Sequence, residues 1–316
     1  MNFGFTEEQL ALAETVCDVL RAHCPAAALR GERRPAWKEL AGLGFFGLLA
    51  PAEAGGLGLG LADVVPALEE TGRACLPGPV AETVVAAAYL PGAASGELCV
   101  GIVPAGQDHA SDADLADLIV VARDDGLRVV ARESARLVPR RGPDSSRPLF
   151  EVSFEASEPL SGSVEAISRR ITVATSAQLI GVARELLAVT VGYARVRTQF
   201  GAAIGSFQAV KHQLADVAVA VEFAAPLVWR AALSVDGDVP TADRDVSAAK
   251  AAAGEAATLA ARVALQVHGA IGYTEELDLR FWLARAWSLS AAYGTTAAHR
   301  ERLRHTLTGG DLGRYP

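Results

Sequence analysis

The spacing of apolar residues predicts helices over roughly the first 95 residues. Thr6 and Gln9 have the spacing of a capping box, which marks the start of a helix. One face of this first helix carries Leu10, Ala13, Val16, Cys17 and Leu20. Further helices are expected from Pro35 through Leu43, from Leu61 through Arg73, and in the apolar run that follows "CLPGP".

Between about residues 97 and 157 the apolar residues no longer follow helical spacing. The runs "ELCVGIVPA", "DLIVVAR", "LRVVARE" and "PLFEVSFEA" are short and rich in Val, Ile and Phe, which is typical of strands. Asp125-Gly126 between two of these runs indicates a tight hairpin. We therefore expect a small antiparallel β unit inserted into an otherwise helical chain.

Helical spacing returns after about residue 162. Helices are predicted over about 163–197, 207–234 and 246–267, and one or two last helices over about 277–306. The connections are short, which suggests a four-helix bundle. The predicted fold class is therefore mainly α with a small inserted antiparallel β domain. The expected domains are an N-terminal helical domain over 1–95, a middle β domain over 96–160 and a helical bundle over 161–316.

Composition and charge narrow the possible partners. The 316 residues are 51% hydrophobic and 21% charged, with a net charge of −8, which disfavours nucleic acid as the main partner. No uninterrupted apolar run is long enough for a membrane span, and the N-terminal residues lack the pattern of a signal peptide, so we expect a cytoplasmic protein. The four cysteines form no CxxC pair, and we expect no metal site.

Three segments, in this order along the chain, carry a family resemblance. They are "WKELAGLGFFGLLAPAEAGGLGLGLADVVPALEETGRA", "GYARVRTQFGAAIGSFQAVKHQLAD" and "ALQVHGAIGYTEELDLRFWLARA". Together with the order of helices, β unit and bundle, they make the chain resemble the acyl-CoA dehydrogenases. These FAD enzymes introduce a double bond between Cα and Cβ of an acyl-CoA thioester. The resemblance covers most of the chain.

The resemblance implies a set of FAD contacts in which the segment around His268 reaches the FAD of a neighbouring subunit. Arg197 offers phosphate a planar fork of donors, and Gln208 and Gln266 both donate and accept hydrogen bonds. As isolated residues, Arg197 would be an ordinary surface arginine and His268 a structural hydrogen-bonding residue. The implied contacts are Arg197, Thr198, Gln199, Phe200, Phe207, Gln208, Gln266, Val267, His268, Gly269, Ala270, Gly294 and Thr295.

The chain departs from the family where the catalytic glutamate belongs. In "AAYGTT", Gly294 and Thr295 match the family motif, but Tyr293 stands at the position of the glutamate. The alternative early position of the glutamate falls at Ile171. A tyrosine with an ordinary pKa near 10 is a poor base at neutral pH. The β zone is also about half the family's length and lacks the segments that wall the flavin ring, so no catalytic residue is expected in this chain.

These departures predict the short, non-catalytic subunit of a hetero-oligomeric acyl-CoA dehydrogenase. A full-length paralogue would supply the glutamate, bind most of the acyl-CoA, share FAD at the interface and reduce an electron-transfer acceptor. The chain resembles in this respect the actinobacterial α2β2 dehydrogenases that shorten sterol side chains attached to CoA. Two alternatives stay open: a self-sufficient homo-oligomer with a displaced base such as Glu222 or Glu275, and an FAD-free scaffold for a paralogue. A flavin-dependent oxygenase fits less well, because the flavin wall is lost.

Overall fold

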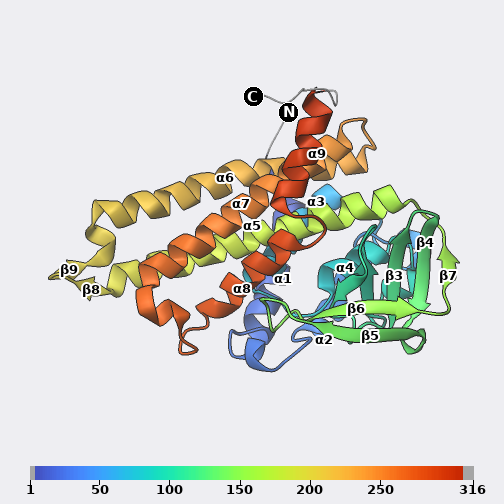
Figure 1. Cartoon of the computed structure of the whole chain (residues 1–316), viewed down its shortest axis with the longest axis horizontal. Coiled ribbons are helices and arrows are strands. Elements are labelled where there is room, and N and C mark those ends of the chain that lie inside the picture. Colours follow the sequence, from blue (N-terminus) through green and yellow to red (C-terminus); the bar gives the residue numbers. More distant parts are fainter. Residues whose placement is uncertain (1–3, 309–316) are drawn as a thin grey trace.

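The computed structural model describes residues 4–308 and contains two helical parts with a β unit between them in sequence (Figure 1). Residues 1–3 and 309–316, at the outer ends of the first and last predicted domains, lie outside the described residues. The predicted fold class is confirmed. Within the described range, the short 3-10 turns are η1 (Ala28–Arg30), η2 (Phe45–Gly47), η3 (Ala52–Ala54), η4 (Pro91–Ala93), η5 (Arg132–Ser134), η6 (Ile204–Ser206) and η7 (Gly269–Tyr273).

The N-terminal part contains α1 (Glu7–His23), α2 (Trp37–Gly42), α3 (Leu61–Arg73) and α4 (Val80–Ala86). The predicted capping box is confirmed, because the Thr6 side chain accepts from the Gln9 backbone and the Gln9 side chain accepts from the Thr6 backbone. Burial along the predicted apolar face of α1 is uneven. Val16 and Leu20 are buried, whereas Leu10 is 52% exposed.

The β unit consists of two small sheets. One has the strand order β1-β3-β4-β7 and the other β2-β6-β5. The predicted hairpin joins β3 and β4, with Arg123 paired to Gly126. The expectation of a wholly antiparallel unit needs one correction: β1 and β3 pair in parallel, because the chain leaves the first sheet to form β2 before it returns. The strands are β1 (Val100–Val103), β2 (His109–Ser111), β3 (Leu118–Arg123), β4 (Gly126–Ala131), β5 (Ala135–Arg140), β6 (Leu149–Phe154) and β7 (Glu158–Leu160).

The C-terminal part is built on three long helices, α5 (Val164–Val196), α6 (Gln208–Asp236) and α7 (Ala242–His268). Two shorter ones follow, α8 (Leu279–Ala291) and α9 (Thr296–Thr308), and a two-stranded hairpin of β8 (Thr198–Gln199) and β9 (Ala202–Ala203) joins α5 to α6. The third long helix begins four residues earlier than predicted. In Figure 1 the hairpin lies at one end of the bundle and the β unit at the other.

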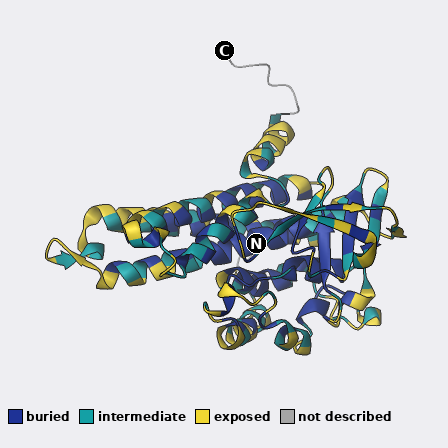
Figure 2. Ribbon diagram, turned by 60° about the horizontal axis from the view of Figure 1, so that its bottom comes forward, coloured by how far each residue is buried: buried dark blue, intermediate teal, exposed yellow. Residues whose placement is uncertain are grey.

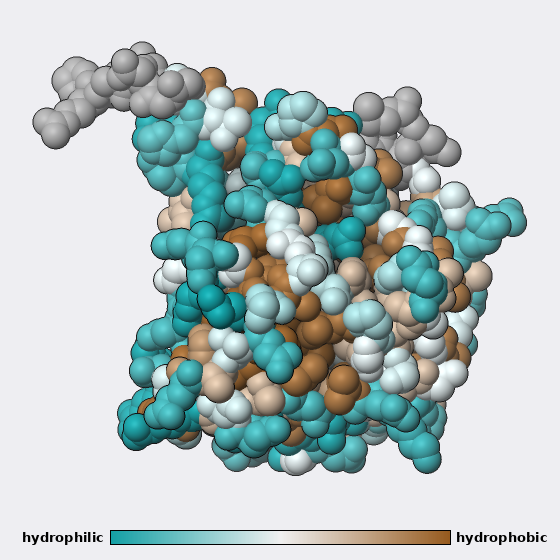
Figure 3. Space-filling model, turned by 90° about the vertical axis from the view of Figure 1, so that its right-hand side faces the viewer, coloured by the Kyte–Doolittle hydropathy of each residue, from teal (hydrophilic) through white to brown (hydrophobic). Residues whose placement is uncertain are grey.

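The core follows α5, which packs against α3, α6, α7 and α8. Two glycines allow α3 and α5 to approach closely: a Cβ on Gly72 would overlap the backbone of Gln178, and one on Gly181 would overlap the backbone of Glu69. Burial is densest where these helices meet the strands, while the hairpin end is exposed (Figure 2). On the face at the β-unit end, hydrophobic residues show at the centre among hydrophilic ones (Figure 3).

The helix α6 has the length and apolar composition of a membrane span. Core helices of water-soluble proteins pass the same test, and α6 packs against α5 and α7 in the bundle. Its composition is therefore weak evidence for a membrane.

Candidate cofactor-binding site

The end of the bundle farthest from the β unit gathers most of the residues for which the sequence implies a cofactor role (Figure 1). We call this region, residues 193–212 and 262–273, the distal end. It combines the end of α5, the β8–β9 hairpin, the start of α6 and the end of α7. The rings of Tyr193 on α5 and His268 on α7 stack with centroids 4.2 Å apart, which joins the two segments of the distal end.

The hairpin presents an aromatic ring to solvent. Gln199 pairs with Ala202, so Phe200 and Gly201 form a two-residue turn with φ of 53° and 79°. Positive φ at both positions is the geometry of a type I′ turn, which is uncommon for phenylalanine. Phe200 is 95% exposed, and its ring has an edge contact with Phe207 at 6.3 Å. An aromatic side chain held outward in this way is suited to contact another molecule.

The distal end carries exposed cations in a chain that is acidic overall. Arg195, Arg197, Lys211 and Arg262 are all exposed. Within residues 4–308 none of these side chains forms an ion pair, whereas many other arginines, such as Arg169 with Asp243, do. Uncompensated guanidinium and ammonium groups on one region favour an anionic ligand such as a phosphate.

The end of α7 contributes both backbone groups and side chains to the distal end. Gly269 ends the helix with φ 64° and ψ −142°, a conformation that essentially only glycine adopts. Open space surrounds the position of its missing Cβ, so backbone conformation rather than packing requires this glycine. Gln266 on the last turn and Ala270 after the glycine are exposed.

Two residues with implied cofactor contacts lie elsewhere. Gly294 and Thr295 connect α8 to α9, and α8 begins near η7 and runs about 20 Å away from it. Gly294 has φ 105°, and a Cβ there would meet the imidazole of His299. The Thr295 hydroxyl accepts a hydrogen bond from the Ala298 backbone at the start of α9. The structure gives both residues roles in shaping this connection.

The two positions at which the resemblance expects the catalytic glutamate are both enclosed. Ile171 is 1% exposed within the core. Tyr293 is buried, and its hydroxyl donates a hydrogen bond to Glu82 on α4 at 2.7 Å. Burial, and then the Glu82 carboxylate, raise the pKa of Tyr293 well above its usual range. A phenol in this setting keeps its proton and cannot act as a general base at neutral pH.

Glu82 belongs to a buried polar cluster that the sequence did not reveal. Its Oε1 also accepts from Arg147 at 3.1 Å, and Arg147 donates to Ser288 on α8. The side chains of Glu82 and Arg147 are 6% and 10% exposed. The cluster therefore joins α4, the connection between β5 and β6, and the region around α8.

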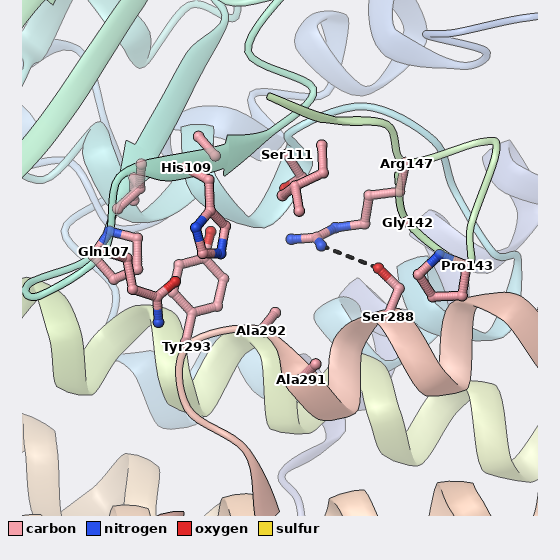
Figure 4. A pocket seen from close by; sticks show the side chains of 14 residues that line it. Gln107, His109, Ser111, Gly142, Pro143, Arg147, Ser288, Ala291, Ala292 and Tyr293 are labelled. Carbon is pink, nitrogen blue, oxygen red and sulfur yellow. Dashed lines mark hydrogen bonds between the residues drawn. The ribbon is translucent and has the colours of Figure 1, made fainter. Parts of the chain in front are cut away.

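A cavity of about 120 Å³ adjoins this cluster (Figure 4). His109, Arg147, Ser288 and Tyr293 are among its lining residues. Small-molecule sites usually measure roughly 300 Å³ or more. The space beside Tyr293 is thus too small for a flavin ring and a thioester together.

Two further buried groups, Lys250 and His299, hold the backbone of residues 290–294 around Tyr293. The Lys250 ammonium donates to the Ser290 and Gly294 carbonyls, and burial lowers the pKa of Lys250 to about 7. His299 Nε2 donates to the Tyr293 carbonyl at 3.0 Å, while His299 Nδ1 accepts from the Ser247 hydroxyl. In the sequence, the only sign that Lys250 has a special role is that its charge interrupts the Ala-rich run "SAAKAAAG".

Family models match both helical parts of the chain. The model described as acyl-CoA dehydrogenase, N-terminal domain, matches residues 6–97, and the model described as acyl-CoA dehydrogenase, C-terminal domain, matches residues 168–308. The distal end and Tyr293 lie within the second match.

Individual relatives agree with the family models. The chain is 33% identical over 298 residues to acyl-CoA dehydrogenase IpdE2 of Mycobacterium tuberculosis, covering 89% of this chain and 91% of the relative. A chain of the ChsE4–ChsE5 complex from Mycobacterium tuberculosis superimposes with a TM-score of 0.88 at 23% identity, covering 99% of this chain and 100% of that one. A chain of the Tcur3481–Tcur3483 steroid ACAD G363A variant gives a TM-score of 0.87 at 24% identity, covering 96% of this chain and 98% of that one. At these identities the two structural matches show the fold.

Proposed function

Because the chain belongs to the acyl-CoA dehydrogenase family, we propose that it is the short, non-catalytic subunit of a hetero-oligomeric, FAD-dependent acyl-CoA dehydrogenase. The partner is a full-length paralogue that supplies the catalytic glutamate and holds most of the acyl-CoA and FAD. This chain supplies the distal end as a wall of the shared FAD site. The three-domain division at residues 95 and 160 is part of this proposal.

The observation that carries the proposal is the contrast between the distal end and the surroundings of Tyr293. The distal end offers unpaired cations, exposed amides and an exposed aromatic ring, which suit a pyrophosphate and an adenine. The surroundings of Tyr293 are closed by the bond to Glu82, and the cavity there is small. A chain built this way fits the adenosine diphosphate half of FAD and not its reactive ring.

The roles of the residues follow from this division. Arg197 donates to the pyrophosphate, and Gln208 and Gln266 donate to and accept from the adenosine half. Bound FAD supplies the hydride acceptor for the desaturation. The α-proton goes to the glutamate of the partner, since Tyr293 keeps its own proton and Ile171 has none to exchange. The reduced enzyme then passes its electrons to an electron-transfer acceptor.

The names of the similar proteins support the choice of partner and substrate class. One similar structure is that of the ChsE4–ChsE5 complex, and another is called a steroid ACAD. We propose by analogy an α2β2 assembly acting on the CoA thioester of a steroid side chain in the cytoplasm.

Flavin quantification of the purified complex tests the proposal. We expect this chain, co-expressed with a full-length paralogue from the same genome, to bind one FAD per heterodimer, and Arg197→Ala to remove most of the flavin. Arg21→Ala, which removes an exposed arginine on α1, is the matched control and should leave the flavin content unchanged. Flavin and acyl-CoA oxidation by the chain alone would establish a self-sufficient enzyme instead. Full flavin content with Arg197→Ala would favour an FAD-free scaffold.

A further inference from the structure

The helix α6 carries apolar side chains on its outer side as well as on the side that packs in the bundle. Its inner side packs against α5 and α7, where Val217 and Val221 are each 1% exposed. Its outer side carries Val219 and Phe223, which are 56% and 77% exposed. In the described part of the chain nothing covers this outer side, which forms an edge of the bundle (Figure 1). A helix that is apolar all round is normally buried on all sides, so we expect a partner for α6.

The outer residues of α6 recur with the spacing of a coiled-coil seam. Steps of three and four residues alternate along it, and such steps hold one face of a helix against a second helix over several turns. The inner face already makes the contacts of α6 within the bundle, so this spacing points to a helix of another chain. We call these residues the α6 seam: Asp216, Val219, Phe223, Pro226, Arg230 and Leu233.

The outer side of α6 is complementary to itself about Phe223. Val219 lies four residues before Phe223, and Leu227, which is 39% exposed, lies four residues after it. Asp216 lies seven residues before Phe223, and Arg230 lies seven residues after it. If two α6 helices cross antiparallel at Phe223, Val219 of each meets Leu227 of the other, and Asp216 meets Arg230. A two-fold interface requires this relation, in which residue i contacts j and j contacts i.

Charge and shape favour a second copy of this chain as the partner. Arg230 pairs with Asp245 within the chain, but its side chain is 38% exposed, and a guanidinium can bind a second carboxylate with its five N–H groups. A groove of about 790 Å³ lies beside Phe223, between α6, α7 and α9, and small residues such as Ala224 line it. The groove leaves room for the Phe223 ring of the second copy. A membrane fits less well, because the Asp216 carboxylate would lose its water without gaining a cation.

We propose that two copies of this chain associate through the α6 seam, in an antiparallel contact whose two-fold axis passes at Phe223. This contact goes beyond the proposed function, which assigns contacts only between unlike chains. In an assembly of two short and two full-length subunits, it connects one FAD-sharing pair to the other. The α6 seam and the distal end have no residue in common, so the two contacts do not compete for the same side chains.

Engineered disulfides test the position of the axis and the direction of the helices. In Phe223→Cys the two thiols meet at the axis, and mild oxidation should join two copies, in the purified chain and in its complex with the paralogue. In Val219→Cys the two thiols lie about 12 Å apart along the helix, too far for a disulfide. A mixture of Val219→Cys and Leu227→Cys chains should form the mixed disulfide in large excess. The wild type, whose Cys17 is partly exposed, is the control.

Two charge substitutions test the association itself by analytical ultracentrifugation. Phe223→Glu brings two carboxylates together at the axis, and we expect the Kd between the two copies to rise more than about tenfold. Asp216→Arg places two arginines opposite each other and should also raise this Kd, by less at high salt because the repulsion is screened. Leu10→Glu, at an apolar residue of α1 that is 52% exposed, is the matched control and should leave the Kd unchanged.

The results that overturn the proposal differ from those that overturn the proposed function. If Phe223→Cys forms no disulfide between copies, either alone or in the complex, or if Phe223→Glu associates as tightly as the wild type, α6 does not join two copies. In the complex, Phe223→Glu should leave a single FAD-sharing pair with unchanged flavin content. Arg197→Ala should remove flavin and leave the Phe223→Cys disulfide intact. Failure of either proposal therefore leaves the other standing.

Discussion

The hydroxyl of Tyr293 donates a hydrogen bond to the carboxylate of Glu82 at 2.7 Å, across 211 positions of sequence. A carboxylate therefore does lie beside the position at which the resemblance expects a glutamate, but it comes from α4. Arg147 neutralises it at 3.1 Å, and the surrounding protein buries it. The Glu82–Arg147 ion pair joins α4 to the β unit, and Arg147 extends the contact to Ser288 on α8.

Restoring a glutamate at position 293 should not restore catalysis. In Tyr293→Glu a second carboxylate would meet Glu82 in a buried site, where like charges repel and raise one pKa. We expect a lower melting temperature and no acyl-CoA-dependent reduction of an electron acceptor by the chain alone. Tyr293→Phe, the control, loses only the hydrogen bond, at about 1–2 kcal/mol of unfolding free energy. Turnover by the Tyr293→Glu chain would contradict the assignment of this site as structural.

Replacing two glycines of α5 by alanine should change the unfolding free energy in opposite directions, because Gly181 faces α3 closely and Gly192 faces open space. Gly181→Ala would place a methyl group against the Glu69 carbonyl, and we expect a loss of about 2–3 kcal/mol in unfolding free energy. Gly192→Ala meets no atom within 4 Å, and we expect a gain of about 0.5–1 kcal/mol from helix propensity. Denaturant titration of both variants measures the difference. A harmless Gly181→Ala would mean that α3 and α5 are farther apart than described.

Buried His299 predicts a loss of stability at acid pH. Burial lowers its pKa from 6.5 to about 4, so between these values the unfolded chain binds the proton more readily than the folded chain. A contribution of about 3 kcal/mol is present above pH 6.5 and is lost as the pH falls to 4. His299→Gln keeps a donor for the Tyr293 carbonyl but does not titrate. Denaturant titrations from pH 7 to pH 4 should show that the unfolding free energy declines less steeply for this variant than for the wild type. An equal decline in both proteins would refute the lowered pKa of His299.

The exposed ring of Phe200 should matter to the complex and not to the isolated chain. Phe200→Ser removes a side chain that is 95% exposed, so we expect the unfolding free energy of the chain to change by less than about 0.5 kcal/mol. Retention of FAD and of the full-length paralogue during co-purification should fall. Leu57→Ser, at an exposed residue of the N-terminal part, should change neither quantity. Unchanged assembly with Phe200→Ser would place the interface elsewhere.

Much of the architecture could be predicted because it is locally encoded. The capping box of Thr6 and Gln9, the period-two runs of the strands and the helical spacing of the bundle depend on neighbouring residues. The parallel pair of β1 and β3 was mispredicted because it depends on where the chain re-enters a sheet. The exposure of Leu10 could not be predicted either, because it depends on which element covers that face.

The sequence by itself determined the family, the order of the elements and the absence of a glutamate at positions 171 and 293, since motifs and substitutions are local. Only the tertiary structure showed that Glu82 meets Tyr293, that Lys250 binds the Gly294 carbonyl and His299 the Tyr293 carbonyl, and that His268 stacks on Tyr193. These contacts join residues that are 6 to 211 positions apart. No spacing along the chain specifies such pairs, because packing of the helices and the β unit decides which side chains share a buried space.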